Sequence, residues 1–81
     1  MAGRAERQLS QLPEKVATAV METLATIPEN PRRIGKQLHF ELEGVWAARR
    51  GPYRILYELD GRRRRITVIA IGHRSDVYRR T

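Results

Sequence analysis

The chain has 81 residues, with sixteen Lys and Arg against nine Asp and Glu, and it contains no cysteine. This length fits one domain, residues 1–81, with a small hydrophobic core. Without cysteine there is neither a disulfide framework nor a thiolate metal site, and two histidines are too few for a metal cage. No apolar run reaches the roughly 20 residues that span a bilayer, and no signal-peptide pattern opens the chain. The sequence therefore predicts a soluble, cytoplasmic protein without metal or cofactor.

The net charge of +7 comes almost entirely from arginine, since fourteen of the sixteen cations are Arg. Arginine stays charged at every physiological pH, and its planar fork of donors matches the oxygens of a phosphate group. The bias favours a polyanionic partner, either RNA, DNA or an acidic protein. The alternative interpretation is that a basic surface only keeps the protein in solution.

Two short helices are predicted at the start of the chain. Apolar residues spaced three and four apart form one stripe over residues 2–12, at Ala2, Ala5, Leu9 and Leu12. Pro13 followed by Glu14 is typical of a helix start. A second stripe continues with Val16, Val20, Met21, Leu24 and Ile27. We expect a helical hairpin whose apolar stripes pack on a sheet.

Residues 28–41 are predicted to be a connection. Pro28 and Pro31 end the second helix, because proline cannot continue the helical hydrogen bonds and restricts the residue before it. The segment is longer than most connections in compact domains, and such long loops tend to carry function. It is also basic, with Arg32, Arg33 and Lys36.

Three later runs are rich in β-branched and aromatic residues and predict strands at Val45–Arg49, Tyr53–Leu59 and Ile66–Ile71. Tight turns are expected at Arg50-Gly51-Pro52 and at Asp60-Gly61, so the three strands should form an antiparallel meander. In the third run the residues that would face each side of the sheet are apolar. A strand covered on both faces is expected to lie at the centre of the sheet, so the third run is predicted to be central. Four arginines, Arg62 to Arg65, follow the second turn and are best interpreted as a solvated charge run.

The last residues are predicted to form a short helical tail. Ser75 or Asp76 is a possible cap for a last turn. The tail is expected to return Tyr78 over the sheet face that carries Arg54, with Arg74 at the strand exit. Two arginines and a phenol would then share one opening.

The order and spacing of several motifs resemble one known family. These motifs are AERQLSQLPEKV, GKQL, LEGVWAARRGPYRILY and IGHRSDVY. Together they resemble the RelE/ParE superfamily of toxins of bacterial type II toxin–antitoxin modules, over essentially the whole chain. The resemblance implies an α+β fold in which an N-terminal helical hairpin packs on a small antiparallel sheet, here of three strands. The family usually opens with a strand, and this sequence starts at the helix.

The resemblance also implies an activity. RelE-like members are endoribonucleases that cleave mRNA on the ribosome, by attack of the ribose 2′-OH on the adjacent phosphate to leave a cyclic phosphate. By that resemblance Arg54 holds the scissile phosphate, Arg74 lies by the leaving 5′-oxygen, and Tyr78 stacks on a base. Positioned cations and stacking rings are also what phosphoryl transfer on an unpaired strand requires.

The sequence departs from the RelE pattern in the strand before the YR motif. The family has lysines there, whereas Val45–Ala48 contains no ionisable residue. Lys36 and His73 are the substitutes by position and chemistry, since histidine exchanges a proton near neutral pH. The alternative for His73 is simple packing beside the strand end. A set of basic residues is expected to bind backbone phosphate or ribosomal RNA. Two of them, Arg49 and Arg50, should lie beside the opening, and the others are Lys36, Arg32 and Arg33.

The partners implied are a RelB-like acidic antitoxin, the ribosome and mRNA, with operator DNA contacted only through the antitoxin and no membrane. Two alternatives remain open. One is a ParE-like toxin that binds gyrase without chemistry, which the absent lysines favour. The other is a catalytically degenerate member that acts only in the antitoxin and operator complex.

Overall fold

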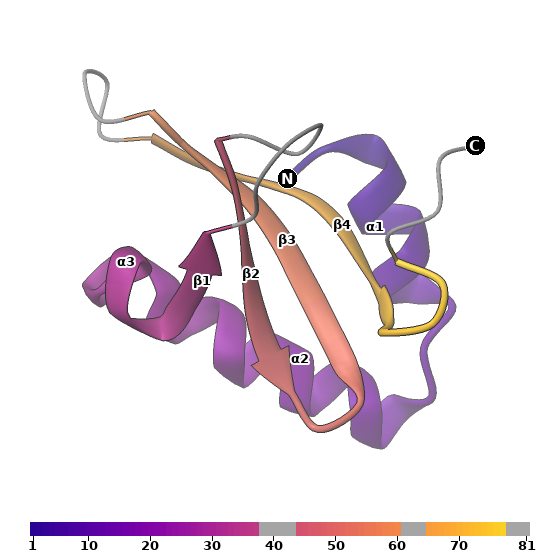
Figure 1. Ribbon diagram of the computed structural model, residues 1–81. Helices are drawn as coiled ribbons and strands as arrows, with labels where there is room; N and C mark the ends of the chain where they lie inside the picture. The colour runs from indigo at the N-terminus through magenta and orange to yellow at the C-terminus, as the bar shows by residue number, and fades with distance from the viewer. Residues whose placement is uncertain (38–43, 61–64, 78–81) are drawn as a thin grey trace.

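The computed structural model describes residues 1–37, 44–60 and 65–77, except for the side chain of Arg33, and shows helices against one face of an antiparallel sheet (Figure 1). The helices are α1 (Gly3–Ser10), α2 (Glu14–Thr26), the 3₁₀ turn η1 (Ile27–Glu29) and α3 (Pro31–Ile34). The strands are β1 (Gly35–Gln37), β2 (Val45–Arg50), β3 (Tyr53–Asp60) and β4 (Arg65–His73). The predicted α+β class and the helical hairpin on an antiparallel sheet are confirmed.

The sheet has four strands in the described part of the chain, not three, because part of the predicted connection is ordered secondary structure. Residues 27–37 form η1, α3 and β1, and β1 pairs antiparallel with the outer edge of β2. Pro28 and Pro31 each lie in the first turn of a short helix, where the missing N–H would have had no helical partner. The prolines end α2 as predicted, but they also start new elements. Residues 38–41 of the predicted connection lie outside the described residues.

The strand order is β1-β2-β3-β4, so the third predicted strand is at an edge of the sheet and not at its centre. It is apolar at both parities because each face is covered separately, by α1 on one side and by Val77 on the other. Its outer edge is also protected, because the Ala2 N–H donates to the Val68 carbonyl at 2.8 Å. The Ile71 N–H donates to the Gln8 side chain at 2.7 Å. Helix α1 therefore blocks an edge that would otherwise invite another strand.

The β3–β4 hairpin is antiparallel as predicted, but its register differs from that of a two-residue turn at Asp60-Gly61. Leu59 lies opposite Ile66 and Asp60 opposite Arg65, so Arg65 already belongs to β4. Residues 61–64, which include Arg62 to Arg64, lie outside the described part. A bulge at Leu56/Tyr57 shifts the register once along this ladder.

The main core lies between the helices and the sheet. Its buried members are Ala5, Val20, Ile27, Ala48, Ile55, Tyr57, Val68 and Ile71. Met21, which belongs to the predicted apolar stripe of α2, is 53% exposed instead. The Tyr57 hydroxyl donates to the Pro31 carbonyl and thereby ties α3 to the centre of the sheet. Among the described residues, no helix combines the length and the apolar character needed to cross a membrane.

Candidate nucleic-acid interface on the distal face

The sheet face turned away from the helices, which we call the distal face, carries three of the cations that sequence analysis singled out. Residues that oppose each other in an antiparallel ladder point to the same face. Lys36 of β1 lies opposite Ala47, and Arg49 of β2 lies opposite Arg54 of β3. Since Ala47 and Arg49 are two positions apart, Lys36, Arg49 and Arg54 all belong to the distal face.

The floor of the distal face is apolar. Val45, Ala47, Leu56 and Ala70 form a second buried cluster, and Val77 covers it with 2% of its surface exposed. Val77 also contacts Gly72, where an added Cβ would lie 3.5 Å from the Val77 Cβ. The turn after β4 is therefore folded down onto the distal face. Residue 78, the predicted stacking tyrosine Tyr78, follows directly and lies outside the described residues.

Arg49 and Arg54 form a like-charge pair directly across the β2–β3 ladder. Opposed like charges destabilise a sheet by roughly 0.2–1 kcal/mol. Within the described part of the chain, no carboxylate forms an ion pair with either of them, and Glu58 on the same face of β3 is exposed. The fold thus concentrates positive charge here without neutralising it, as expected of a surface that binds an anion.

The Arg54 side chain is held by the turn between β2 and β3. Its Nη1 donates to the Gly51 carbonyl at 2.8 Å and to the Tyr53 carbonyl at 2.9 Å. Gly51 has φ +57°, in the left-handed region that glycine enters at no steric cost. The turn therefore fixes one end of the guanidinium, while Nε and Nη2 make no hydrogen bond within residues 1–37, 44–60 and 65–77.

Arg74 reaches the same turn from the other side. Its backbone N–H donates to the Pro52 carbonyl at 2.8 Å, and its side chain is exposed. Consecutive carbonyl oxygens of one tight turn thus hold Arg54 by its side chain and Arg74 by its backbone. The two arginines that sequence analysis assigned to phosphate come from separate elements and are hydrogen-bonded to the same turn, Arg54 through its guanidinium and Arg74 through its backbone.

Two other predicted site residues lie on the helix-facing side of the sheet. One row across the sheet points toward the helices. It consists of Arg50, Tyr53 and His73, which lie opposite one another on β2, β3 and β4. Arg50 donates to Glu22 of α2 at 3.4 Å, and both side chains are about half exposed or more, at 48% and 64%. The prediction that Arg50 lies beside the opening with Arg49 is therefore wrong, because adjacent residues of a strand point to opposite faces. The His73 ring packs edge-on against Tyr53, with centroids 5.7 Å apart.

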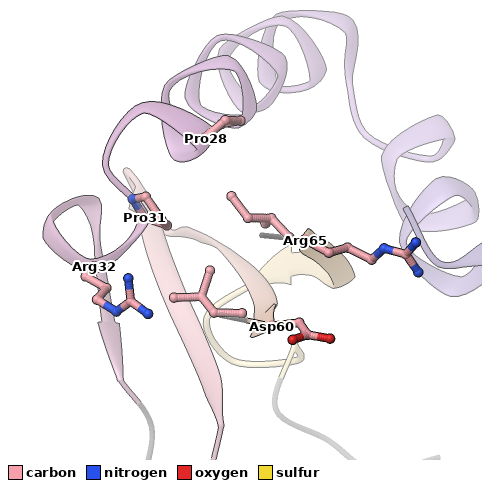
Figure 2. A pocket seen from close by; sticks show the side chains of 7 residues that line it. Pro28, Pro31, Arg32, Asp60 and Arg65 are labelled. Atoms are coloured by element: carbon pink, nitrogen blue, oxygen red, sulfur yellow. The ribbon is translucent and has the colours of Figure 1, made fainter. Parts of the chain in front are cut away.

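Arg32 lies at the far end of the sheet. It lines a pocket of about 300 Å³ with Pro28, Pro31, Leu59, Asp60, Arg65 and Ile66. Figure 2 shows Arg32 on one side of this pocket and Arg65 and Asp60 on the other. Asp60 and Arg54 are six positions apart on β3, about 20 Å at the rise of a strand. The pocket is thus separate from the two arginines at the Gly51–Pro52 turn, and Arg33 lies beside Arg32 in α3.

Sequence reasoning missed the parts of this interface that backbone geometry supplies. The carbonyls of Gly51 and Pro52 carry no sequence signal for binding arginine, although the Gly-Pro pair did predict the turn. Val77 was not identified as the cover of the distal floor. An isolated apolar residue in a polar tail, such as Val77 in RSDVYRRT, is the signal that would have indicated it.

Fold and interface together define a small basic α+β protein that presents arginines beside an apolar sheet floor. Residues 2–78 match the family described as ParE toxin of type II toxin-antitoxin system, parDE. The chain belongs to this family, within the RelE/ParE superfamily of toxins of type II toxin–antitoxin systems.

Similar proteins of Mycobacterium tuberculosis agree with this membership. Toxin RelG is 40% identical over 77 residues, which cover 94% of this chain and 88% of RelG. Toxin RelE is 45% identical over 76 residues, which cover 93% of this chain and 78% of that toxin. The crystal structure of the toxin–antitoxin complex RelBE2 contains a chain with a TM-score of 0.83 and 36% identity, over 89% of this chain and 90% of that one.

Proposed function

We propose that this toxin is a ribosome-dependent endoribonuclease that cleaves mRNA and so inhibits translation. The observation that carries the proposal is the meeting of Arg54 and Arg74 at the Gly51–Pro52 turn, beside the unneutralised charge of Arg49. Arginine forks suit the nonbridging oxygens of a phosphodiester. The apolar floor beside them suits an unstacked base.

In the proposed reaction the ribose 2′-oxygen forms a bond to the adjacent phosphorus, and the bond from phosphorus to the 5′-oxygen breaks. The products are a 2′,3′-cyclic phosphate and a free 5′-hydroxyl. Arg54, through Nε and Nη2, would stabilise the charge that develops on the nonbridging oxygens. Arg74 would stabilise the negative charge on the leaving 5′-oxygen, which takes its proton from water, and Tyr78 would stack on the base.

The proton of the 2′-OH needs an acceptor, and β2 supplies none. Val45 and Ala47, the distal-face residues of β2 before Arg49, belong to the buried floor. Lys36 lies opposite Ala47 on the distal face and is exposed. Its ammonium group has donors only, so in this proposal it stabilises the charge that develops on the 2′-oxygen while water accepts the proton. RelE-like sequences carry lysines in the strand before the YR motif, which is β2 here. In this proposal Lys36 of the neighbouring strand β1 takes the place of those lysines.

A cognate antitoxin is the proposed partner of the toxin when it is inactive. The chain carries a net charge of +7, and Lys36, Arg49, Arg54 and Arg74 make no ion pair in the part of the chain that the structure describes. An acidic, RelB-like segment laid over the distal face would neutralise this surface and exclude mRNA. Operator DNA would be contacted through the antitoxin, and the site of action would be the ribosome in the cytoplasm.

Primer extension on mRNA from translating ribosomes tests the activity. We expect new 5′ ends with the wild-type toxin and their loss with Arg54→Ala, by about 10²–10³-fold in cleavage rate, the usual effect of removing one transition-state donor. Arg50→Ala is the matched control, because Arg50 is a neighbouring exposed arginine on the opposite face. Equal cleavage by the wild type and Arg54→Ala would refute the assignment, and no cleavage by the wild type would refute the activity.

The second candidate function is a ParE-like toxin that inhibits gyrase without chemistry. Two observations favour it: the match to the ParE toxin family, and the lack of an ionisable residue over Val45–Ala48. A supercoiling assay separates the two functions. Inhibition of gyrase together with intact mRNA would support this candidate over the nuclease.

A further inference from the structure

His73 ends β4, and its imidazole is bonded to the turn that follows it. Nδ1 lies 3.2 Å from the backbone nitrogen of Ser75 and 2.8 Å from the Ser75 hydroxyl oxygen. The His73 carbonyl is also engaged, because it accepts from the N–H groups of Asp76 at 2.8 Å and Val77 at 2.9 Å. Three of the turn's backbone N–H groups therefore converge on this one residue.

The hydrogen bond from Ser75 decides which ring nitrogen carries the proton. A backbone N–H only donates, so Nδ1 is the acceptor and the proton of the neutral ring is on Nε2. In this tautomer the lone pair of Nδ1 is occupied by the turn, and Nε2 is a donor. The neutral ring then has no free lone pair with which to take a proton from a 2′-OH.

The location of the ring leads to the same conclusion. His73 shares its row with Arg50 and Tyr53, on the parity that faces the helices, and its ring packs against Tyr53. Arg54, by contrast, lies opposite Gly72 on the distal face. A base that acts on a nucleotide held by Arg54 would have to lie on the distal face, and His73 lies on the helix-facing side.

What His73 does determine is the path of the chain that carries Arg74 and Val77. Arg74 lies between His73 and Ser75, the two residues joined by the Nδ1 hydrogen bond. The Arg74 N–H donates to the Pro52 carbonyl. The turn after β4, to which Arg74 belongs, also brings Val77 onto the distal floor. Loss of the Nδ1 bond would free the Ser75 end of the Arg74 backbone.

We propose that His73 is a positioning residue and not the general base: its Nδ1 lone pair holds the turn that places Arg74 near the leaving 5′-oxygen. This inference rests on the proposed nuclease function and deepens it. It also gives His73 a role that the neighbouring residues on β3 and β4 do not duplicate, because the Ser75 N–H has no other acceptor among the described residues.

Two amide substitutions separate positioning from base catalysis. In His73→Asn the amide oxygen is attached to Cγ, as Nδ1 is in histidine, so it can accept from the Ser75 N–H. In His73→Gln the amide lies one bond further out, near the place of Nε2, and does not reproduce that acceptor. Neither amide can act as a base at neutral pH. Ser75→Ala keeps the backbone N–H and is the control for the hydroxyl contact.

The experiment measures single-turnover cleavage of mRNA on programmed ribosomes with saturating toxin, alongside ribosome binding and the melting temperature. We expect His73→Asn to keep most of the wild-type rate, and His73→Gln to lose about a hundredfold, the effect of displacing a catalytic group by about 1 Å. Ribosome binding and melting temperature should be similar for both variants. Ser75→Ala should cleave like the wild type.

If His73→Asn is as inactive as His73→Gln, the ring acts by more than its Nδ1 acceptor and the proposal is overturned. Equal full activity of both variants would overturn it as well. Hydrogen exchange of the Ser75 amide gives a readout that does not need cleavage: protection in the wild type and His73→Asn, and its loss in His73→Gln, is expected. A wild-type toxin that fails to cleave but shows this exchange pattern would refute the nuclease function and leave the positioning of the turn intact.

Discussion

Arg54 and Arg74 are joined through one turn, because the Arg54 guanidinium donates to the Gly51 carbonyl and the Arg74 N–H donates to the Pro52 carbonyl, each at 2.8 Å. The separation of the two arginines is therefore set by the backbone of the Gly51–Pro52 turn. A change in that turn should alter the proposed site more than it alters the stability of the fold.

Gly51→Ala tests this dependence. Gly51 has φ +57° and open space around an added Cβ, so the substitution strains the backbone without a steric clash. We expect a loss of about 1–2 kcal/mol in the free energy of unfolding, measured by urea denaturation. We also expect a fall in cleavage rate of about a hundredfold, because both carbonyl oxygens move.

Gly44→Ala is the matched control for Gly51→Ala. Gly44 has φ +85° and equally open surroundings, but it precedes β2 at the other end of that strand. It should lose similar stability and keep its cleavage rate. Equal losses of activity in the two variants would show that strain alone, and not the position of the carbonyls, limits the reaction.

Arg49→Gln should make the protein more stable and less active. The substitution removes the charge opposed to Arg54, so the free energy of unfolding should rise by roughly 0.2–1 kcal/mol. Affinity for single-stranded RNA should fall, and the slope of log affinity against log salt should decrease by about 0.7 for one lost phosphate contact. Arg50→Gln, on the other face, should leave that slope unchanged. An unaltered slope in Arg49→Gln would show that Arg49 does not contact phosphate.

Gly35→Ala should disrupt the attachment of β1 to the core. An added Cβ would overlap the Tyr57 hydroxyl and lie 2.7 Å from its Cζ, so the two elements would have to move apart. We expect a loss of about 1–3 kcal/mol in the free energy of unfolding, as for other overpacked sites. The double variant Gly35→Ala/Tyr57→Phe should recover only part of this loss, because the ring carbon remains in the way. Full stability of Gly35→Ala would contradict the close packing.

Tyr57 should make stability fall at alkaline pH. Burial raises the pKa of Tyr57 above its ordinary value of 10.0, so the folded state prefers the protonated phenol. The stabilising contribution is complete below pH 10, where the unfolded phenol is also protonated, and it is lost as pH rises through the folded-state pKa.

Urea titrations of the wild type and Tyr57→Phe, at pH 8 and at several values above pH 10, measure this effect. At pH 8 the Phe variant should be less stable by about 0.5–1.5 kcal/mol, because the hydrogen bond to the Pro31 carbonyl is lost. The difference should shrink as pH rises past 10. A constant difference over this range would show that the Tyr57 phenol does not titrate differently in the folded and unfolded states.

Local patterns in the sequence predicted the elements that depend on neighbouring residues. The apolar spacing of residues 2–27 gave the two helices, the β-branched runs gave β2, β3 and β4, and Gly51-Pro52 gave the turn between β2 and β3. Alternation along β3 puts Leu56 on the face opposite Ile55 and Tyr57, and these residues do belong to the two separate buried clusters. Alternation along a strand needs no knowledge of the remaining fold.

Features that depend on contacts between distant segments were missed. Strand β1 has only three residues, and it becomes a strand because β2 offers an edge and Gly35 leaves room for Tyr57. The edge position of β4 was missed for a similar reason. Its second apolar face is covered by Val77 from the chain end and not by another layer, and apolar composition does not reveal what covers a strand.

The sequence by itself determined the chemistry available to this toxin: an arginine-rich surface, no cysteine, a helical hairpin and a set of β-runs with arginines at their ends. Only the tertiary structure decided which arginines act together. The ladder register puts Arg49 opposite Arg54 and sends Arg50 to Glu22, while the backbone of one turn joins Arg54 to Arg74. Charge is a property of each residue, whereas register and hydrogen bonding to a shared turn exist only once distant segments have packed.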